Sequence, residues 1–167
     1  GYKIAEQFGH GIIPTRAGLV PLTFQNNILE MCKGLTGVSV EASISNDKAA
    51  FAEGMLFTHR GLSGPSVLQI SSYWREKETV TVNLAPDTDI LAYLKARKQD
   101  TPKQDVQNVI ADILPKRLAT SLCDINDISG RLADLPDTRL QIFANAVNRW
   151  VILPDGTEGY RTAEVTL

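Results

Sequence analysis

The sequence predicts an α+β protein, a small β-barrel with an inserted α-helical subdomain. Residues 12–86 contain several segments in which apolar and polar residues alternate, which is the pattern of half-buried strands. Residues 87–148 instead place apolar residues three and four positions apart, as amphipathic helices do. Strand patterns then return. The expected division is a barrel lobe from residues 12–86 and 149–167, a helical lobe from 87–148, and a short helix and joint at 1–11.

Strands of the barrel are expected where the alternation is clear, at residues 19–22, 38–44, 51–58 and 79–84. Pro21 suits an edge strand, because proline has no N–H to donate to a neighbouring strand. Residues 46–48 predict a hairpin turn, and Gly54 predicts a β-bulge in the strand that follows. One helix is expected among these strands, with Ser63 as its N-cap and Pro65 in its first turn.

The helical lobe is expected to hold four short helices. They are predicted to start after Asp87 or Thr88, at the capping-box sequence Thr101-Pro102-Lys103-Gln104, after Pro115, and at Asp137. Helices this short are not stable alone in water, so they should pack together as a small bundle.

The two ends of the chain suggest a fragment. The chain has no initiator Met and opens on an amphipathic helix pattern with Ile4, Ala5 and Phe8 on one face. Residues 149–153 and 162–167 have strand patterns, and the chain stops within the second of them. An inserted segment leaves and re-enters its host nearby, so we expect residues 1 and 167 to lie on the same side of the molecule.

Composition indicates an ordinary globular protein. The chain has 167 residues and a net charge of −2, with basic residues spread along its length, which argues against a main role in nucleic-acid binding. No apolar run approaches the roughly 20 residues that span a bilayer, so no membrane partner is expected. Cys32 and Cys123 lie far apart and predict two reduced, buried thiols in a cytoplasmic protein.

The segment Leu56–Pro65 holds the densest group of candidate functional residues. A strand ends there, a loop containing Gly61 and Gly64 follows, and a helix begins. A helix N-terminus offers free N–H groups to a phosphate or carboxylate, and His59 and Arg60 stand beside it. A purely structural interpretation also stands: Ser63 then only caps the helix, and His59 only bonds to the backbone.

Other site types find little support in the sequence. Turn chemistry explains Asp155-Gly156 but not the following Tyr160 and Arg161, which suggests that these two face a ligand. Ser63 lacks the Gly-x-Ser-x-Gly elbow of serine hydrolases. No group of residues has metal-ligand spacing, and neither a G-x-G-x-x-G fingerprint nor a Walker loop occurs.

Four blocks together resemble one family of flavoproteins. They are GYKIAEQFGH at 1–10, AGLVPL at 17–22, LFTHRGLSGP at 56–65 and GTEGYRTAEVT at 156–166. In this order they resemble the BaiN-like family of bacterial NAD(P)/FAD-dependent oxidoreductases. The resemblance implies a parent protein with a Rossmann-like FAD domain that is split in sequence, with this chain as the insert that covers a small-molecule substrate.

The implied function is that of a substrate-covering insert. Its partners would be the FAD-binding domain of the same parent chain and a small-molecule substrate, with no nucleic acid. FAD would bind in the parent, NAD(P)H-linked chemistry would follow there, and this chain alone would bind no cofactor. We expect both candidate loops to face the FAD domain, with His59 as proton donor near neutral pH. The residues expected to line the cavity are Arg60, Gly61, Ser63, Gly64, Tyr160 and Arg161.

An alternative function belongs to a different class. Small barrels and helical bundles also serve as independent protein- or nucleic-acid-binding adaptor modules. A G-x-G-x-x-G sequence upstream in the same reading frame would separate the two hypotheses, because only the oxidoreductase needs it.

Overall fold

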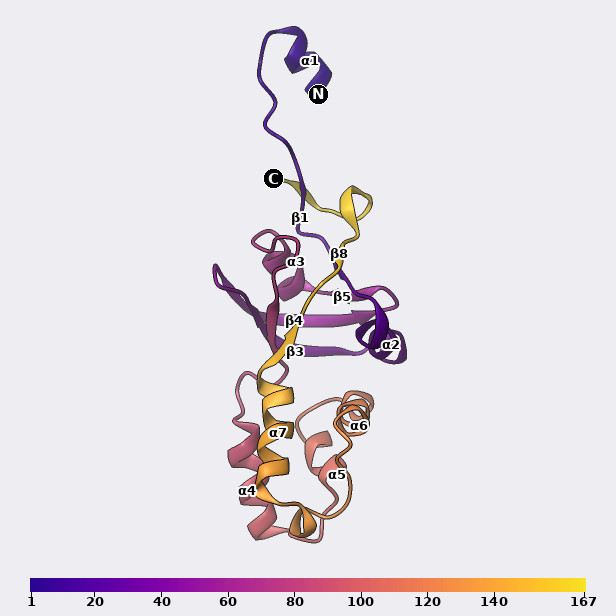
Figure 1. The fold of residues 1–167 in the computed structure, drawn as a ribbon, viewed down its shortest axis with the longest axis vertical. Helices are drawn as coiled ribbons and strands as arrows, with labels where there is room; N and C mark the ends of the chain where they lie inside the picture. The colour runs from indigo at the N-terminus through magenta and orange to yellow at the C-terminus, as the bar shows by residue number, and fades with distance from the viewer.

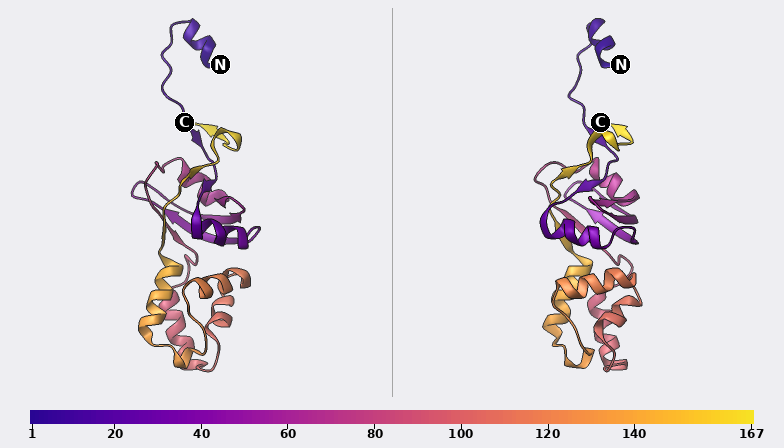
Figure 2. Two further views of the ribbon diagram at one scale, coloured as in Figure 1. Left: turned by 45° about the vertical axis from the view of Figure 1, so that its right-hand side comes forward. Right: turned by 90° about the vertical axis from the view of Figure 1, so that its right-hand side faces the viewer.

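The computed structural model describes residues 1–167 as an elongated molecule with two lobes and a neck. Figure 1 shows the helical lobe at the bottom, the barrel lobe in the middle and a narrow neck above it that leads to both termini. The two further views in Figure 2 keep this order. The predicted α+β class, a barrel with a helical part within it, is confirmed. Both termini lie at the neck end of the molecule.

The barrel is a seven-stranded antiparallel sheet in the order β7-β6-β3-β4-β5-β2-β8. Its strands are β2 (Leu22–Thr23), β3 (Ser39–Ser45), β4 (Ala50–Thr58), β5 (Gly61–Ser63), β6 (Val80–Asn83), β7 (Trp150–Ile152) and β8 (Gly156–Thr157). The two edge strands, β7 and β8, are consecutive in the chain and only residues 153–155 separate them. Four residue steps span at most about 14 Å. The sheet must therefore curl until its edges are close, and a covalent link completes the barrel.

The long β3–β4 hairpin forms the centre of this sheet. Its pairing runs without interruption from Ser39 opposite Leu56 to Ser45 opposite Ala50. Gly54 pairs directly with Glu41, so the predicted β-bulge at Gly54 is wrong. The turn predicted at residues 46–48 is present, and the Asn46 side chain accepts hydrogen bonds there from the N–H groups of Lys48 and Ala49, both at 2.9 Å.

Helix α3 (Pro65–Ser71) packs against β3, β4 and β5. Val67 and Ile70 are fully buried, as their spacing predicts, and Trp74 is buried just after the helix. Ser63 is not the N-cap. It ends strand β5, and Gly64 caps the helix with a φ of 93°, a conformation that serine adopts only with strain.

A second helix in the barrel lobe was not predicted. Helix α2 (Asn26–Gly34) lies within the stretch that sequence patterning assigned to strands, and it packs against β4 and β5. Cys32, which belongs to this helix, is buried, and so is Leu35, which directly follows it. Ile28, Met31, Cys32 and Leu35 do follow helical spacing, but short polar segments on either side hide the pattern.

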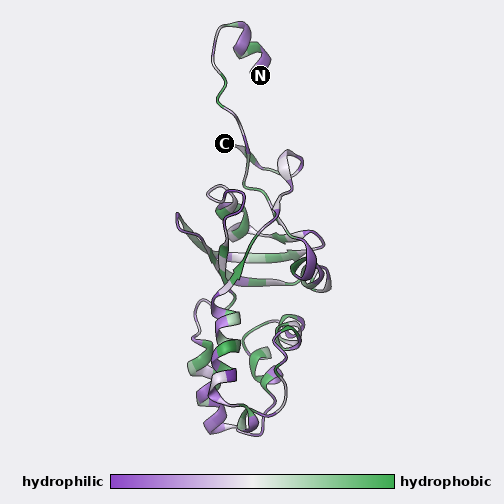
Figure 3. Cartoon of the chain, viewed as in Figure 1, coloured by the Kyte–Doolittle hydropathy of each residue, from purple (hydrophilic) through white to green (hydrophobic).

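The helical lobe consists of α4 (Ile90–Asp100), α5 (Val106–Ala111), α6 (Lys116–Ile125), the short 3₁₀ helix η1 (Leu132–Asp134) and α7 (Asp137–Asn148). Helix α4 packs against α7, and α5 against α6. Figure 3 shows hydrophobic residues along these helices and along the barrel strands. The apolar core is continuous through both lobes. The domain boundaries at residues 86 and 148 stay a prediction.

Three helix caps predicted in this lobe are wrong. The N-cap of α4 is Asp89, not Asp87 or Thr88, and its carboxylate accepts from the Ala92 N–H at 3.0 Å. Thr101 ends α4 instead of starting the next helix, and residues 101–104 form a turn in which the Gln104 N–H donates to the Thr101 carbonyl at 3.0 Å. The N-cap of α5 is Asp105, whose carboxylate accepts from the Gln107 N–H at 3.0 Å. Asp137 lies in the first turn of α7, and Pro136 occupies the N-cap position.

The neck joins the barrel to the two ends of the chain. Strand β1 (Ala17–Gly18) pairs with β9 (Val165–Thr166), and the 3₁₀ helix η2 (Gly159–Arg161) lies just before β9. Beyond the neck, helix α1 (Tyr2–Gln7) buries none of its residues, and the Phe8 that follows it is 77% exposed. The predicted helix is therefore present, but its apolar face has no partner in this structure.

Candidate functional site

The loop between β4 and β5 carries His59 and Arg60 at an exposed tip. The Thr58 hydroxyl holds the turn, because its oxygen accepts from the N–H groups of Arg60 at 3.3 Å and Gly61 at 3.2 Å. Neither His59 nor Arg60 forms an ion pair. The side chains at this tip are therefore available for contact with a partner.

The glycines of the same segment serve the barrel itself. A Cβ atom at Gly61 would lie 2.2 Å from the Leu22 carbonyl oxygen, and one at Gly64 would lie 2.7 Å from the Gly54 carbonyl oxygen. These glycines therefore let their own segment approach the backbones of strands β2 and β4 closely. Gly61 and Gly64 thus have a structural role, and contact of Gly61, Ser63 and Gly64 with a ligand stays a prediction.

The two predicted loops lie at opposite ends of neighbouring strands. Strands β5 and β8 flank β2 and run in the same direction, with Gly61 and Gly156 both opposite Thr23. Residues 59–60 precede β5, whereas residues 160–161 follow β8. Figure 1 shows the second group, in η2, in the neck close to the C-terminus. The structure therefore presents two separate contact points rather than one cavity lined by both loops.

Tyr160 and Arg161 are exposed in this neck. The Tyr160 side chain is 57% exposed, and its hydroxyl donates to the Thr15 hydroxyl at 2.8 Å, which ties η2 to the segment before β1. Arg161 has no ion-pair partner.

A polar groove of about 530 Å³ marks the junction of the two lobes. At its centre the Asn148 amide donates to Asn83 Oδ1 at 2.9 Å, to the Ala85 carbonyl at 3.2 Å and to the Thr88 carbonyl at 3.0 Å. Its oxygen accepts from the Ile90 N–H at 3.0 Å. The Asn148 side chain, which lies in one of the two segments that connect the barrel lobe to the helical lobe, thus forms hydrogen bonds to the other segment.

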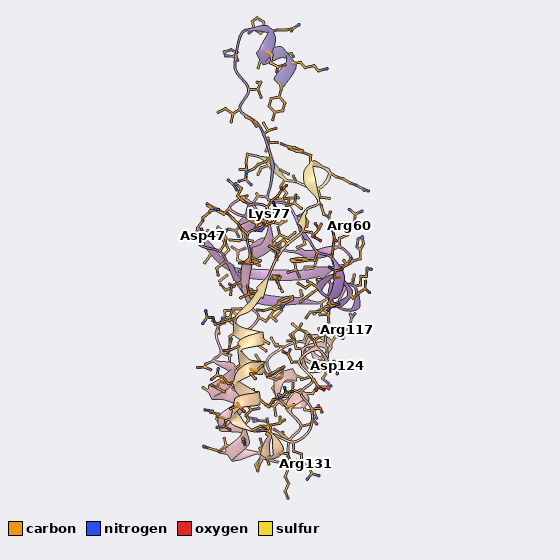
Figure 4. The ribbon with its side chains drawn as sticks, viewed as in Figure 1. Asp47, Arg60, Lys77, Arg117, Asp124 and Arg131 are labelled. Atoms are coloured by element: carbon orange, nitrogen blue, oxygen red, sulfur yellow. The ribbon has the colours of Figure 1, made fainter.

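A second groove, of about 430 Å³, separates α2 of the barrel lobe from α6 of the helical lobe. Arg117 crosses it, and its guanidinium donates to the Gly34 carbonyl at 2.7 Å, at the C-terminal end of α2. Figure 4 shows Arg60, Arg117 and Asp124 along the same side of the molecule, which extends over both lobes. This side carries Arg60 and Arg117 without a carboxylate partner within 4.0 Å.

No group of His, Cys, Asp or Glu is arranged to hold a metal ion. Both cysteines are buried free thiols, and burial raises the pKa of Cys32 to about 12 and that of Cys123 to about 11, so neither is an activated nucleophile. The two loops and the groove at the junction of the lobes carry exposed polar and charged side chains.

Comparison with models of protein families identifies the two lobes. Residues 16–165 match the family model described as HI0933-like protein barrel and H2TH domain. The chain belongs to the HI0933-like family. The match covers the barrel lobe and the helical lobe together, so these two lobes are the barrel and the H2TH part of this family.

Two curated relatives of this HI0933-like chain carry the same name. The ribosomal RNA dihydrouridine synthase of Escherichia coli (strain K12) is 48% identical over 171 residues, and that of Haemophilus influenzae (strain ATCC 51907 / DSM 11121 / KW20 / Rd) is 38% identical over 169 residues. Each match covers 100% of this chain but only 42% of the relative. The chain therefore spans less than half of the length of these relatives.

These findings correct three predictions. The assignment to BaiN-like oxidoreductases is wrong, because the family match is HI0933-like and the relatives are named as RNA-modifying enzymes. The function as an insert over a small-molecule substrate is wrong for the same reason. The expected absence of nucleic acid is contradicted as well, and the nucleic-acid-binding alternative fits the relatives better than the main hypothesis does.

The error about nucleic acid has a physical cause. The sum of all charges says little about binding, because charges act over roughly 10 Å at moderate ionic strength. Arg60 and Arg117 lack ion-pair partners, whereas Asp137 is occupied by Lys95 and Lys98, and Glu78 by Lys48. A chain with a net charge of −2 can therefore present a locally cationic surface.

Sequence reasoning also missed Arg117 and Asn148, whose side chains form hydrogen bonds between the two lobes. Pro115-Lys116-Arg117 does signal a helix start with two cations, but nothing in the sequence places it beside the end of α2.

No helix here combines the length and the apolar character that crossing a lipid bilayer requires.

Proposed function

We propose that this chain is the RNA-contacting part of a ribosomal RNA dihydrouridine synthase. The observation that carries the proposal is the 48% identity to such a synthase over the whole chain. The exposed cations and the polar groove at the junction of the lobes support a binding role. The cytoplasmic location expected from the sequence is compatible with a ribosomal RNA substrate and stays a prediction.

The name of the relatives states a reaction, the formation of dihydrouridine in ribosomal RNA, and this reaction defines what the whole protein would have to do. Saturation of the C5=C6 bond of uracil adds one hydride equivalent and one proton, so a reductant must supply two electrons. A flavin of the FAD type in the whole protein has the required chemistry. The residues of this chain do not fit a dinucleotide, because they contain no G-x-G-x-x-G fingerprint, and we assign the flavin to the rest of the protein.

The role of this chain is to hold the RNA. Phosphate contacts from Arg and Lys supply most of the affinity for RNA and set its position. A uracil must also leave its base stack before its ring can be reduced. We propose that Arg60 and Arg117, on one side of the two lobes, contact the backbone next to the target nucleotide.

The remaining predicted site residues keep a place in this proposal. Arg161 and Tyr160 form a second contact point in the neck, at the end of the molecule where the chain continues toward both termini. His59, exposed beside Arg60, is proposed as an RNA contact and as the candidate proton donor. Gly61, Ser63 and Gly64 support these loops.

Deletion of the gene that encodes the whole protein tests the proposed function. Mass spectrometry of nucleosides from purified ribosomal RNA should then show loss of a dihydrouridine, which the intact gene restores. A gene with Arg60→Met and Arg117→Met should restore much less than one with Lys103→Met, which removes a cation without an ion-pair partner from the turn after α4. An unchanged amount of dihydrouridine in the deletion strain would contradict the proposed function.

A further inference from the structure

We propose that Arg16 and Arg75 form a binding site for a phosphate of the RNA backbone, at the end of the barrel next to the neck. The inference rests on the proposed function and names a contact that the family match does not assign. Arg16 directly precedes β1, and Arg75 lies in the loop between α3 and β6. They are 59 positions apart in sequence, and the fold brings their guanidinium groups together.

The two guanidinium groups meet at one backbone oxygen. Arg16 Nη2 donates to the Ser72 carbonyl, and Arg75 Nη1 donates to the same carbonyl at 3.3 Å and to the Trp74 carbonyl at 2.9 Å. The backbone of Arg16 is fixed as well, because its N–H and carbonyl exchange two hydrogen bonds of 2.9 Å with Leu167. These bonds use only part of the fork of N–H donors on each guanidinium.

No acidic side chain forms an ion pair with either guanidinium group, because neither group has a carboxylate oxygen within 4.0 Å. The hydrogen bond from Lys48 and, to a smaller extent, the nearby charge of Arg75 lower the pKa of the Glu78 carboxyl. The carboxylate of Glu78 is engaged by Lys48 at 2.6 Å and by the Arg75 backbone N–H at 3.0 Å. Burial and the neighbouring Arg75 both lower the pKa of Arg16, which shows that the two positive charges repel each other. An anion between them would relieve that repulsion.

The space beside the pair suits a phosphate group. A groove of about 440 Å³ is lined by Arg16, Arg75, Glu76 and Thr157, with Ala17 and Trp74 forming its apolar wall. Guanidinium forks match the paired oxygens of a phosphodiester, and the Thr157 hydroxyl adds a neutral donor. Figure 4 shows Lys77 at the same end of the barrel. Glu76 is the opposing charge, and its removal should strengthen anion binding.

Two alternative roles of these arginines lead to different expected results. The arginines could serve only to satisfy the last carbonyl groups after α3, in which case they matter for stability alone. They could instead pair with a carboxylate elsewhere in the whole protein, and RNA binding would then not depend on them. Affinity for RNA and thermal stability, measured on the same variants, separate these cases.

The test uses the full-length protein and a uridine-containing oligonucleotide from ribosomal RNA. Fluorescence anisotropy gives the dissociation constant of the wild type, Arg16→Met, Arg75→Met and the double variant over a range of salt concentrations. We expect each single variant to bind roughly tenfold more weakly, as loss of one charge-assisted hydrogen bond implies. The double variant should be little weaker than either single variant, because both arginines hold one phosphate.

Four controls complete the design. Lys103→Met removes a cation remote from the groove and should leave affinity nearly unchanged, whereas Glu76→Gln should bind more tightly. An oligonucleotide with neutral methylphosphonate linkages should bind wild type and double variant equally. Arg16→Lys should retain the salt dependence that Arg16→Met loses, and this comparison holds even if a methionine variant is less stable.

The outcomes are distinct. Wild-type affinity in the double variant, or a lower melting temperature with unchanged affinity, would overturn this inference and leave the proposed function intact. No binding of RNA by the wild type would overturn both.

Discussion

The barrel lobe and the helical lobe are held together by different kinds of interaction. The barrel depends on strands far apart in sequence, on a covalent link between its two edges and on glycines that let backbones meet. The helical lobe depends on apolar faces of short helices and on side-chain caps such as Asp89 and Asp105. Backbone geometry therefore fixes one lobe, and side-chain packing fixes the second. Matched substitutions in the two lobes should differ most where backbones meet and least at a helix cap.

A matched pair of glycines tests this contrast most strongly. Gly64 in the barrel has a φ of 93° and Gly130 in the helical lobe a φ of 92°, so alanine is strained equally at both positions. A new Cβ at Gly64 would lie 2.7 Å from the Gly54 carbonyl oxygen, whereas at Gly130 it meets nothing within 4 Å. Gly130→Ala should cost about 1–2 kcal/mol of unfolding free energy. Gly64→Ala should cost about 2–5 kcal/mol, because overpacking adds to the strain.

Denaturant unfolding of both variants, with the same m-value analysis, checks this prediction. Equal losses of stability at the two positions would show that the barrel accommodates a side chain at Gly64, and the contrast between the lobes would fail there.

The junction of the lobes depends on Asn148. Asn148→Ala should lower the free energy of unfolding by about 2–3 kcal/mol, because it leaves the Ile90 N–H and several acceptors without partners. Asn145→Ala is the matched control one turn earlier on α7, where the side chain only accepts from exposed Gln141 at 3.2 Å. Thermal unfolding of both variants measures the difference. A similar small effect from each would remove Asn148 from its role at the junction.

The reactivity of the two buried thiols allows the two lobes to be compared in the native state. Burial raises the pKa of Cys32, in the barrel lobe, to about 12 and that of Cys123, in the helical lobe, to about 11. Below both values Cys123 should hold more thiolate than Cys32 and react faster with iodoacetamide. Mass spectrometry of partly alkylated protein gives both rates. Faster alkylation of Cys32 would mean that the barrel lobe opens more readily than the helical lobe.

The same pKa shifts set a dependence of stability on pH. A thiol whose pKa is raised by folding keeps its proton in the native state, while the unfolded chain loses it near pH 9. The contribution of both thiols is therefore complete below pH 9 and declines as pH rises toward 11 and 12. Cys32→Ala should show a shallower decline of unfolding free energy than the wild type over this range.

The smallest effect is expected at a helix cap. Asp89→Ala removes the carboxylate that accepts from the Ala92 N–H at 3.0 Å and should cost about 1 kcal/mol. Asp87→Ala, two positions earlier and outside the helix, should cost close to nothing. Equal melting temperatures for the two variants would show that the cap of α4 does not contribute to the stability of the helical lobe.

The fold class could be predicted from the sequence because it depends on the local periodicity of apolar residues. The alternation at residues 38–44 and the helical spacing after Asp87 both survive in the structure. Helix α2 was missed because short polar segments on either side hide the helical spacing of its apolar residues. The cap at Thr101 was wrong because Asp105 competes for the same role with a stronger acceptor.

The candidate site was far less accessible to such reasoning. His59 and Arg60 are neighbours in sequence and could be singled out, and their role stays a prediction. Arg16 and Arg75 meet only through the fold, as do Arg117 and the end of α2. Total charge concealed these cations, since it averages over groups that are paired and groups that are not.

The proposed function requires that this chain supplies the RNA contacts of a ribosomal RNA dihydrouridine synthase. Ultraviolet crosslinking of the full-length protein to its ribosomal RNA, followed by mass spectrometry of the crosslinked peptides, is the decisive measurement. We expect crosslinks within residues 1–167, from the barrel tip around Arg60 and from the start of α6 around Arg117. Crosslinks confined to the rest of the protein, with none in these two lobes, would contradict the proposed function.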